Sequence, residues 1–210
     1  RLQSNNAAID IASGDKPGGS RLIVTNAARK RWFGNLAVDN TGQDSTGKYQ
    51  GALSLGYDDP LRLNDLVNVS VRHNLDGHFD DTESRAASLY YAVPFGYWLA
   101  SLSYSDFEYT SLVSGAVTDF DTAGTTRTGN LRLDRVLFRD QTRKLTVSLG
   151  LTKKDSRNFI LGELIENNSR DLTILDASMN TSTSWQGVLL FADVGVSKGL
   201  RAFGALHDLD

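Results

Sequence analysis

The sequence predicts an all-β protein, an antiparallel meander of about nine strands, and three features of the chain support this prediction. Apolar and polar residues alternate with a period of two, as they do in strands that bury one face. Short and long connections follow one another in turn between these strands. Helical spacing fits the apolar positions less well, and no run approaches the roughly 18 apolar residues of a transmembrane helix.

The individual strands are predicted from this alternation. Residues 145–152 carry Leu or Val at each odd position and Thr, Ser or Gly at each even position. The alternation breaks after Asp134, which predicts a bulge, and Asp176 and Met179 do not fit one clean face of the eighth strand. The nine predicted strands span residues 32–40, 48–58, 65–75, 85–94, 97–109, 127–138, 143–153, 170–183 and 187–197.

The connections favour a transmembrane β-barrel over a soluble sandwich. Four of them are long and polar, namely 41–47, 76–84, 110–126 and 154–169. The strand after each long connection ends in a short turn to the next strand. Barrels of the outer membrane alternate short and long connections in this way. Aromatic residues near the short-turn ends resemble an interfacial girdle, although they would equally cap the core of a β-sandwich: Trp32, Tyr57, Phe95, Tyr97, Trp98, Phe138 and Trp185.

Composition excludes several classes of function. The 210 residues include 22 Lys+Arg and 25 Asp+Glu, so the net charge of −3 lacks the basic footprint of a nucleic-acid binder. The chain has no cysteine, which excludes disulfides and thiolate metal sites. Catalytic motifs are absent, so we expect no enzyme, no cofactor and no metal. The loop at 76–81, with His78, could bind a cation weakly, but a solvated loop is the favoured interpretation.

The first 31 residues depart from the meander. A turn cluster at 14–20 precedes a short apolar strand at 21–25, and a basic segment follows. We therefore predict that residues 1–31 are the end of a separate domain with its linker, and that residues 32–210 form the meander.

Three motifs resemble the TpsB transporters of two-partner secretion, a branch of the Omp85 superfamily that includes the haemolysin secretion/activation proteins. Residues 15–24 are similar to the end of that family's second POTRA domain, and residues 32–49 to its first barrel hairpin. Residues 58–65, Asp-Asp-Pro-Leu-Arg-Leu-Asn-Asp, are close to the family's "DNPLGLND" turn, from which Asp59 and Arg62 depart.

The resemblance implies a location and a function. A barrel of this family has about sixteen strands in the bacterial outer membrane, so residues 32–210 would be its N-terminal part and residues 1–31 the end of a POTRA domain. The implied partners are outer-membrane lipid and a large, secreted, β-helical exoprotein of the TpsA type. A monomeric barrel would secrete that exoprotein, and some members of the family also activate theirs. The family's Arg-Gly-Phe loop has no match here.

The polar strand face supplies the candidate site residues. In a barrel this face lines a lumen, where mixed charge suits the passage of an unfolded polypeptide. Two alternatives stay open: a porin-like passive channel, and a soluble β-sandwich binding module whose polar face meets solvent. The residues expected to face the lumen and contact the exoprotein are Asn68, Ser70, Arg72, Ser101, Ser103, Arg132, Asp134, Thr146 and Ser148.

Overall fold

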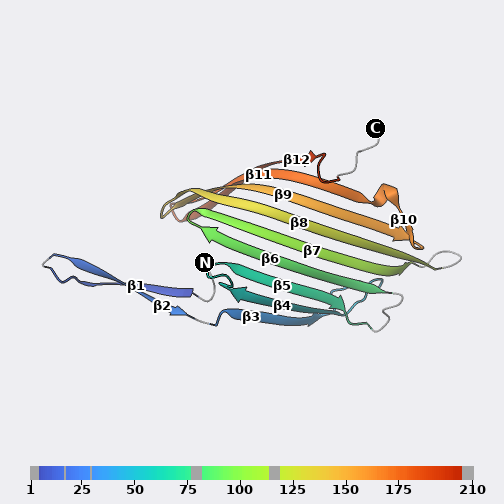
Figure 1. The fold of residues 1–210 in the computed structure, drawn as a ribbon, viewed down its shortest axis with the longest axis horizontal. Helices are drawn as coiled ribbons and strands as arrows, with labels where there is room; N and C mark the ends of the chain where they lie inside the picture. Colours follow the sequence, from blue (N-terminus) through green and yellow to red (C-terminus); the bar gives the residue numbers. More distant parts are fainter. Residues whose placement is uncertain (1–4, 17, 29, 77–81, 114–118, 205–210) are drawn as a thin grey trace.

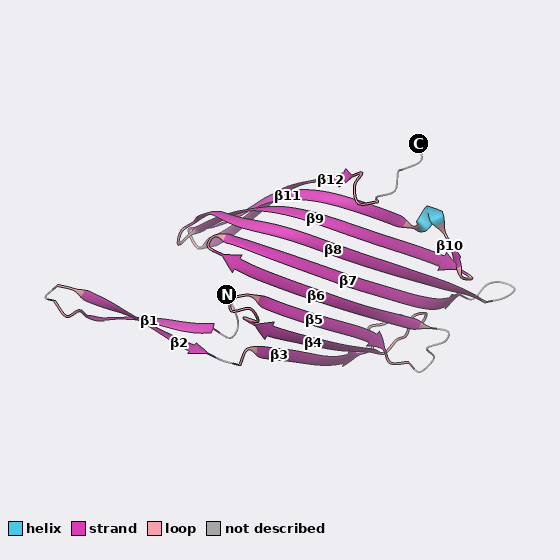
Figure 2. Cartoon of the chain, in the orientation of Figure 1, coloured by secondary structure: helices cyan, strands magenta, loops and turns pink. Residues whose placement is uncertain are grey.

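A computed structural model describes residues 5–204 except 17, 29, 77–81 and 114–118. Most of this part is strand, with one short 3₁₀ helix at Glu166–Asn168 (Figures 1 and 2). None of the helices among the described residues has the length and apolarity needed to cross a membrane. The strands are β1 (Asn5–Ser13), β2 (Ser20–Ala28), β3 (Trp32–Asp39), β4 (Gln50–Asp58), β5 (Leu66–Asn74), β6 (Glu83–Phe95), β7 (Trp98–Val113), β8 (Phe120–Arg139), β9 (Arg143–Ile160), β10 (Glu163–Leu164), β11 (Arg170–Trp185) and β12 (Val188–Leu200).

The predicted meander is confirmed. The large sheet runs in the order β12-β11-β9-β8-β7-β6-β5-β4-β3, every neighbouring pair is antiparallel, and the two-residue β10 pairs with β9. The centres of all nine strands lie where the alternation places them, and the register shift between Val136 and Phe138 is the predicted bulge. Strands β1 and β2 form a two-stranded sheet of their own (Figure 1). The assignment of residues 1–31 to a separate domain stays a prediction.

Two of the predicted long connections are partly strand. Strand β7 continues to Val113, β8 begins at Phe120 and β9 continues to Ile160, so the predicted bounds 110–126 and 154–169 were wrong. Alternation marks the burial of one strand face. In these extensions polar and apolar side chains no longer alternate between the two faces, but the backbone ladder continues and the strand extends with it.

The register joins the apolar positions of neighbouring strands into continuous rows. One row passes directly from strand to strand across β3 to β11: Trp32, Tyr57, Val67, Tyr91, Leu102, Leu131, Leu151 and Leu175. We call the surface that carries this row the apolar face, and the opposite one the polar face. Asp176 and Met179 lie on different faces, because their positions differ by an odd number, so β11 alternates as cleanly as its neighbours.

No second layer packs on the large sheet in the part of the chain that the structure describes. Among the described residues Ala92 is the only buried hydrophobic side chain, whereas Leu131 is 57% exposed and Leu149 is 51% exposed on the apolar face. A soluble β-sandwich would pack such a face against a second sheet. A continuous exposed apolar face of this extent is instead typical of a surface that contacts a membrane or another protein.

The β4–β5 turn is organised around one carboxylate. Asp65 is completely buried, and its side chain accepts hydrogen bonds from the Tyr91 hydroxyl (2.8 Å) and from the backbone N–H groups of Leu61 (3.3 Å) and Leu63 (3.2 Å). Burial alone would raise the pKa of the Asp65 carboxyl. The hydrogen bonds from Tyr91 and the backbone outweigh burial, so this pKa lies below its usual value.

The same turn contains left-handed backbone at the two positions where the sequence departs from the family motif. Asp59 and Arg62 both have φ of 61°. The motif places Asn and Gly there, the two residues that adopt this conformation most readily. Asp is tolerated almost as well as Asn, whereas Arg has no such advantage, so the strain of the turn lies at Arg62.

We predict that Arg62→Gly stabilises the protein. Relief of the left-handed strain, about 1–2 kcal/mol, exceeds the entropy that glycine adds to the unfolded chain, about 0.5–1 kcal/mol. The expected net gain is about 0.5–1 kcal/mol in the free energy of unfolding, measured by urea titration of the full-length protein in lipid vesicles. The neighbouring Leu63→Gly variant is the control, and its free energy of unfolding should fall because Leu63 has no positive φ. Equal effects of the two glycines would contradict the assignment of strain to Arg62.

We also predict opposite sensitivities of the two faces to charge. Leu149→Arg places a cation on the apolar face of β9 and should cost about 2–4 kcal/mol if that position lies near the membrane midplane. Thr146→Arg, on the polar face of the same strand, should cost less than about 1 kcal/mol. Refolding into vesicles and urea unfolding measure both values. A larger cost for Thr146→Arg would reverse the assignment of faces.

Candidate functional site on the polar face

The structure places all nine predicted site residues on the polar face. The register brings some of them directly opposite each other or opposite further polar residues: Ser101 faces Arg132, Ser103 faces Asn130, and Asp134 faces Ser148. A row of hydroxyl side chains crosses β4 to β8 in the same way: Ser54, Ser70, Ser88, Ser105 and Thr128. The shared face was predictable from the alternation. The contact of these residues with an exoprotein stays a prediction.

The nine residues do not converge into one pocket. They form three groups along the sheet, on β5, on β7 and on the pair β8–β9. On β5, Ser70 is hydrogen-bonded to Ser88 (2.7 Å) and Asn68 donates to Ser54 (3.2 Å). Arg72 lies further along, where its Nη2 pairs with the Asp39 carboxylate at 2.8 Å. The site is therefore an extended surface of polar side chains, and it suits a long polymer better than a small ligand.

The group on β8 and β9 is the most highly connected. The Nε of Arg132 donates to Oδ1 of Asp134 at 2.9 Å, and the hydroxyl of Ser148 donates to the same oxygen at 2.5 Å. Ser148 is buried, with 6% of its surface exposed, and Asp134 has hydrogen bonds from both neighbours. This network fixes one cation and one anion side by side on the polar face.

Asp176 of β11 extends this network, and the sequence analysis did not select it. Asp176 lies directly opposite Gly150, which in turn lies opposite Arg132. A Cβ at Gly150 would be 2.4 Å from an Asp176 carboxylate oxygen, so only glycine leaves room for that carboxylate. No residue in the described part of the chain forms an ion pair with Asp176. The strict alternation of residues 175–180 was the signal that could have identified it as a polar-face residue.

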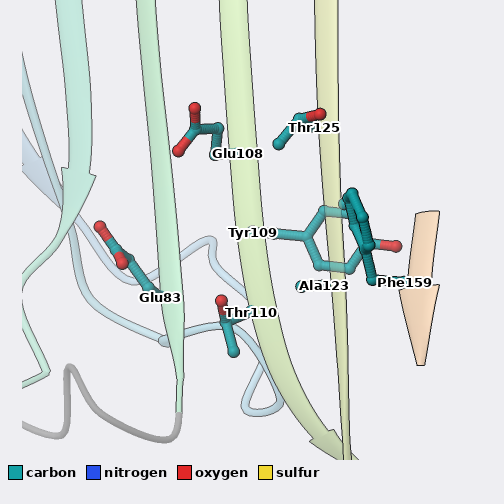
Figure 3. Close-up of a pocket in the computed structure, with 8 residues that line it drawn as sticks. Glu83, Glu108, Tyr109, Thr110, Ala123, Thr125 and Phe159 are labelled. Carbon is teal, nitrogen blue, oxygen red and sulfur yellow. The ribbon is translucent and has the colours of Figure 1, made fainter. Parts of the chain in front are cut away.

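The hollow shown in Figure 3 lies at the long-connection ends of β6 to β9 and contains none of the nine residues. Its volume is about 160 Å³. Two of its lining carboxylates, Glu83 and Glu108, already pair with Arg85, so this hollow offers no free ligand set. Its lining residues are Glu83, Glu108, Tyr109, Thr110, Ala123, Gly124, Thr125 and Phe159.

The described residues include no group of three or more His, Cys, Asp or Glu side chains that could hold a metal ion. His78 and most of the loop at 76–81 lie outside the described residues, as does His207. The weak cation site weighed for that loop is therefore untested.

The apolar face has two distinct borders. At the long-connection end it continues into charged pairs, which we call the charged belt. Arg127 and Asp106 pair at 3.2 Å, as do Arg157 and Asp155, and Arg85 pairs with Glu108. At the short-turn end lie aromatic residues, among which Phe95 and Trp98 stack with ring centres 6.2 Å apart. The charged belt comprises Arg85, Asp106, Glu108, Arg127, Lys153, Asp155, Arg157 and Asp171.

An antiparallel meander with an apolar face, an aromatic border and a polar opposite face defines a segment of the wall of an outer-membrane β-barrel. The chain belongs to the family of the haemolysin secretion/activation proteins ShlB/FhaC/HecB, whose sequence model matches residues 18–210. This confirms the predicted family.

Relatives within this group are named as outer membrane and hemolysin transporters. The chain is 32% identical over 180 residues to the outer membrane transporter CdiB-2 of Burkholderia pseudomallei, which covers 86% of this chain and 31% of the relative. It is 28% identical to the hemolysin transporter protein HpmB of Proteus mirabilis, over 98% of this chain and 36% of the relative. The chain thus spans about a third of the length of these relatives.

Solved structures agree with the fold. The chain superposes on CdiB from Escherichia coli with a TM-score of 0.90 and 28% identity, over 99% of this chain and 38% of that one. The TM-score for CdiB from Acinetobacter baumannii is 0.77, at 25% identity, over 94% of this chain and 38% of that one. The predicted barrel fold and outer-membrane location are confirmed, and the sandwich alternative is wrong.

We predict that the charged group on β8 and β9 sets the ion preference of the barrel lumen. Asp134→Asn removes the anion and leaves Arg132, so the full-length protein in planar bilayers should become more anion-selective, seen as a shift of the reversal potential in a salt gradient. Arg132→Gln should shift it in the opposite direction. Asp155→Asn, in the charged belt, is the control and should leave the reversal potential unchanged. If Asp155→Asn shifted the reversal potential and the other two variants did not, the apolar face would line the lumen.

Proposed function

We propose that the full-length protein is an outer-membrane transporter that secretes a large exoprotein by two-partner secretion, and that it catalyses no covalent reaction. The observation that carries this proposal is the family match over residues 18–210, together with the row of hydroxyl side chains that crosses β4 to β8 on the polar face. Relatives are named for transport, among them the hemolysin transporter ShlB of Serratia marcescens and the CdiB of Dickeya dadantii.

The mixed charge of the polar face suits a polypeptide in transit. Arg132 lies beside Asp134, and Arg72 beside Asp39, so neighbouring charges cancel locally. A strong field of one sign would hold a passing segment of opposite charge. Hydroxyl and amide side chains between these pairs exchange hydrogen bonds with a moving backbone at little net cost, because each bond replaces one to water.

Other parts of the proposal rest on the family. Residues 1–31 are the end of a POTRA domain, which captures the exoprotein by strand addition. The exoprotein passes through the lumen of a monomeric barrel as an extended chain and folds outside, and this folding drives export without ATP. The nine polar-face residues contact the chain in transit, and outer-membrane lipid contacts the apolar face.

Cysteine crosslinking provides the test, because the segment contains no cysteine of its own. Ser101→Cys and Ser103→Cys place thiols on the polar face of β7, whereas Ala100→Cys and Leu102→Cys place them one residue away on the apolar face. The variants are made in the full-length protein and co-expressed with its candidate exoprotein, stalled in transit and carrying one cysteine. Disulfide-linked complexes are expected from the first pair and not from the second.

Three outcomes would contradict the proposal. Crosslinks from the apolar-face positions alone would place the exoprotein outside the lumen. A steady open pore that exports no exoprotein, in bilayers and in cells, would favour the porin-like channel. Equal amounts of exoprotein in the medium with and without this protein would show that it does not secrete the exoprotein.

A further inference from the structure

The β8–β9 turn is the most basic part of the described barrel wall. Within ten residues it carries Arg135, Arg139, Arg143 and Lys144 against one carboxylate, Asp140, in a chain whose net charge is −3. The turn joins two strands at the short-connection end, and in outer-membrane barrels short connections face the periplasm.

Two of these cations lie on the apolar face, each against an aromatic ring. Arg135 is directly opposite Trp98 on β7, with its guanidinium carbon 4.8 Å from the ring centre. The guanidinium of Arg143 is 5.7 Å from the centre of the Phe138 ring. A guanidinium held by its flat face on an aromatic ring keeps its N–H edge available for an anion. The other two cations, Arg139 and Lys144, lie directly opposite each other on neighbouring strands, on the polar face.

The protein leaves these cations largely uncompensated. In the charged belt at the opposite border, Arg85, Arg127 and Arg157 each have a carboxylate partner. Arg135 has no carboxylate partner among the residues that the structure describes, although it is exposed and faces outward. Arg143 lies 3.4 Å from Asp140, and 64% of its side chain is exposed.

Asp140 has a structural role that keeps it from neutralising the turn fully. Its carboxylate accepts hydrogen bonds from the backbone N–H groups of Thr142 (2.8 Å) and Arg143 (2.7 Å). These bonds lower the pKa of Asp140, so it stays ionised while it caps the turn. One anion against four cations leaves the turn positive.

We propose that Arg135 and Arg143 form a binding site for the phosphate groups of anionic phospholipids in the periplasmic leaflet. Each arginine contacts a lipid phosphate at the level of the headgroups, and the rings of Trp98 and Phe138 contact the glycerol and upper acyl region. Aromatic side chains favour this depth, and basic residues beside them attract anionic headgroups. This site is independent of what the barrel secretes, and it rests on the membrane placement alone.

The test measures lipid selectivity of the full-length protein in a neutral detergent. Native mass spectrometry follows the binding of phosphatidylglycerol and, separately, of phosphatidylcholine. The wild type should retain phosphatidylglycerol preferentially. Arg135→Gln with Arg143→Gln should weaken phosphatidylglycerol binding by about fivefold for each arginine, the factor expected for one basic residue near an anionic lipid surface. Added salt should reduce the preference in the wild type.

The matched control removes the same charge from the other face of the same turn. Arg139→Gln with Lys144→Gln should leave the phosphatidylglycerol affinity within about twofold of the wild type, because these positions do not face the lipid. Arg143→Gln alone, at the exposed rim, serves if the double variant fails to fold, and should weaken binding by about fivefold. Heat-modified mobility on gels confirms that each variant is folded.

Three results would overturn the proposal. The first is equal binding of both lipids by the wild type, and the second is an equal loss in the control variant. The third is that an acidic polypeptide, and not a lipid, binds at Arg135 and Arg143. If a poly-glutamate peptide bound the wild type, lost its affinity on removal of Arg135 and Arg143, and phosphatidylglycerol binding did not change, the surface would serve a polypeptide instead of lipid.

Discussion

Backbone hydrogen bonding in a medium without water is the constraint on which the rest of this structure depends. Each N–H and C=O within the membrane must be paired inside the protein, and an antiparallel meander achieves this between neighbouring strands. The pairing fixes the register, and the register fixes which side chains share a face. A slip of one residue at any strand pair would move its apolar side chains to the polar face. The uninterrupted row from Trp32 to Leu175 shows that the register holds across eight strands.

The polar and apolar faces distribute charge in different ways. On the polar face, Arg132 and Asp134 neutralise each other next to the hydroxyl of Ser148. On the described apolar face of β3 to β11, charge occurs at the two borders. The charged belt pairs its cations with carboxylates, whereas Arg135 at the opposite border lies on the ring of Trp98. The two borders of the apolar face therefore differ in charge: one is nearly neutral and the other is basic.

The predictive value of the sequence follows from how alternation arises. Alternation requires one wet face and one apolar face, so it located the centres of all nine strands and the shared face of the nine candidate residues. It failed beyond residue 109 in β7 and beyond residue 153 in β9, where polar and apolar residues no longer alternate and the strands continue without a periodic signal. The position of Asp176 was missed because it was compared with Met179, although the two residues have opposite parity.

The sequence by itself determined the class of fold, the meander order and the family, because periodicity, connection lengths and turn motifs are local properties of the chain. The tertiary structure alone decided which side chains meet. Asp65 lies under Tyr91 across 26 positions, and Gly150 makes room for Asp176. The pairing of Arg135 with Trp98 spans 37 positions. These contacts depend on the register between strands, which no local pattern specifies, because the period of two permits every even-numbered shift.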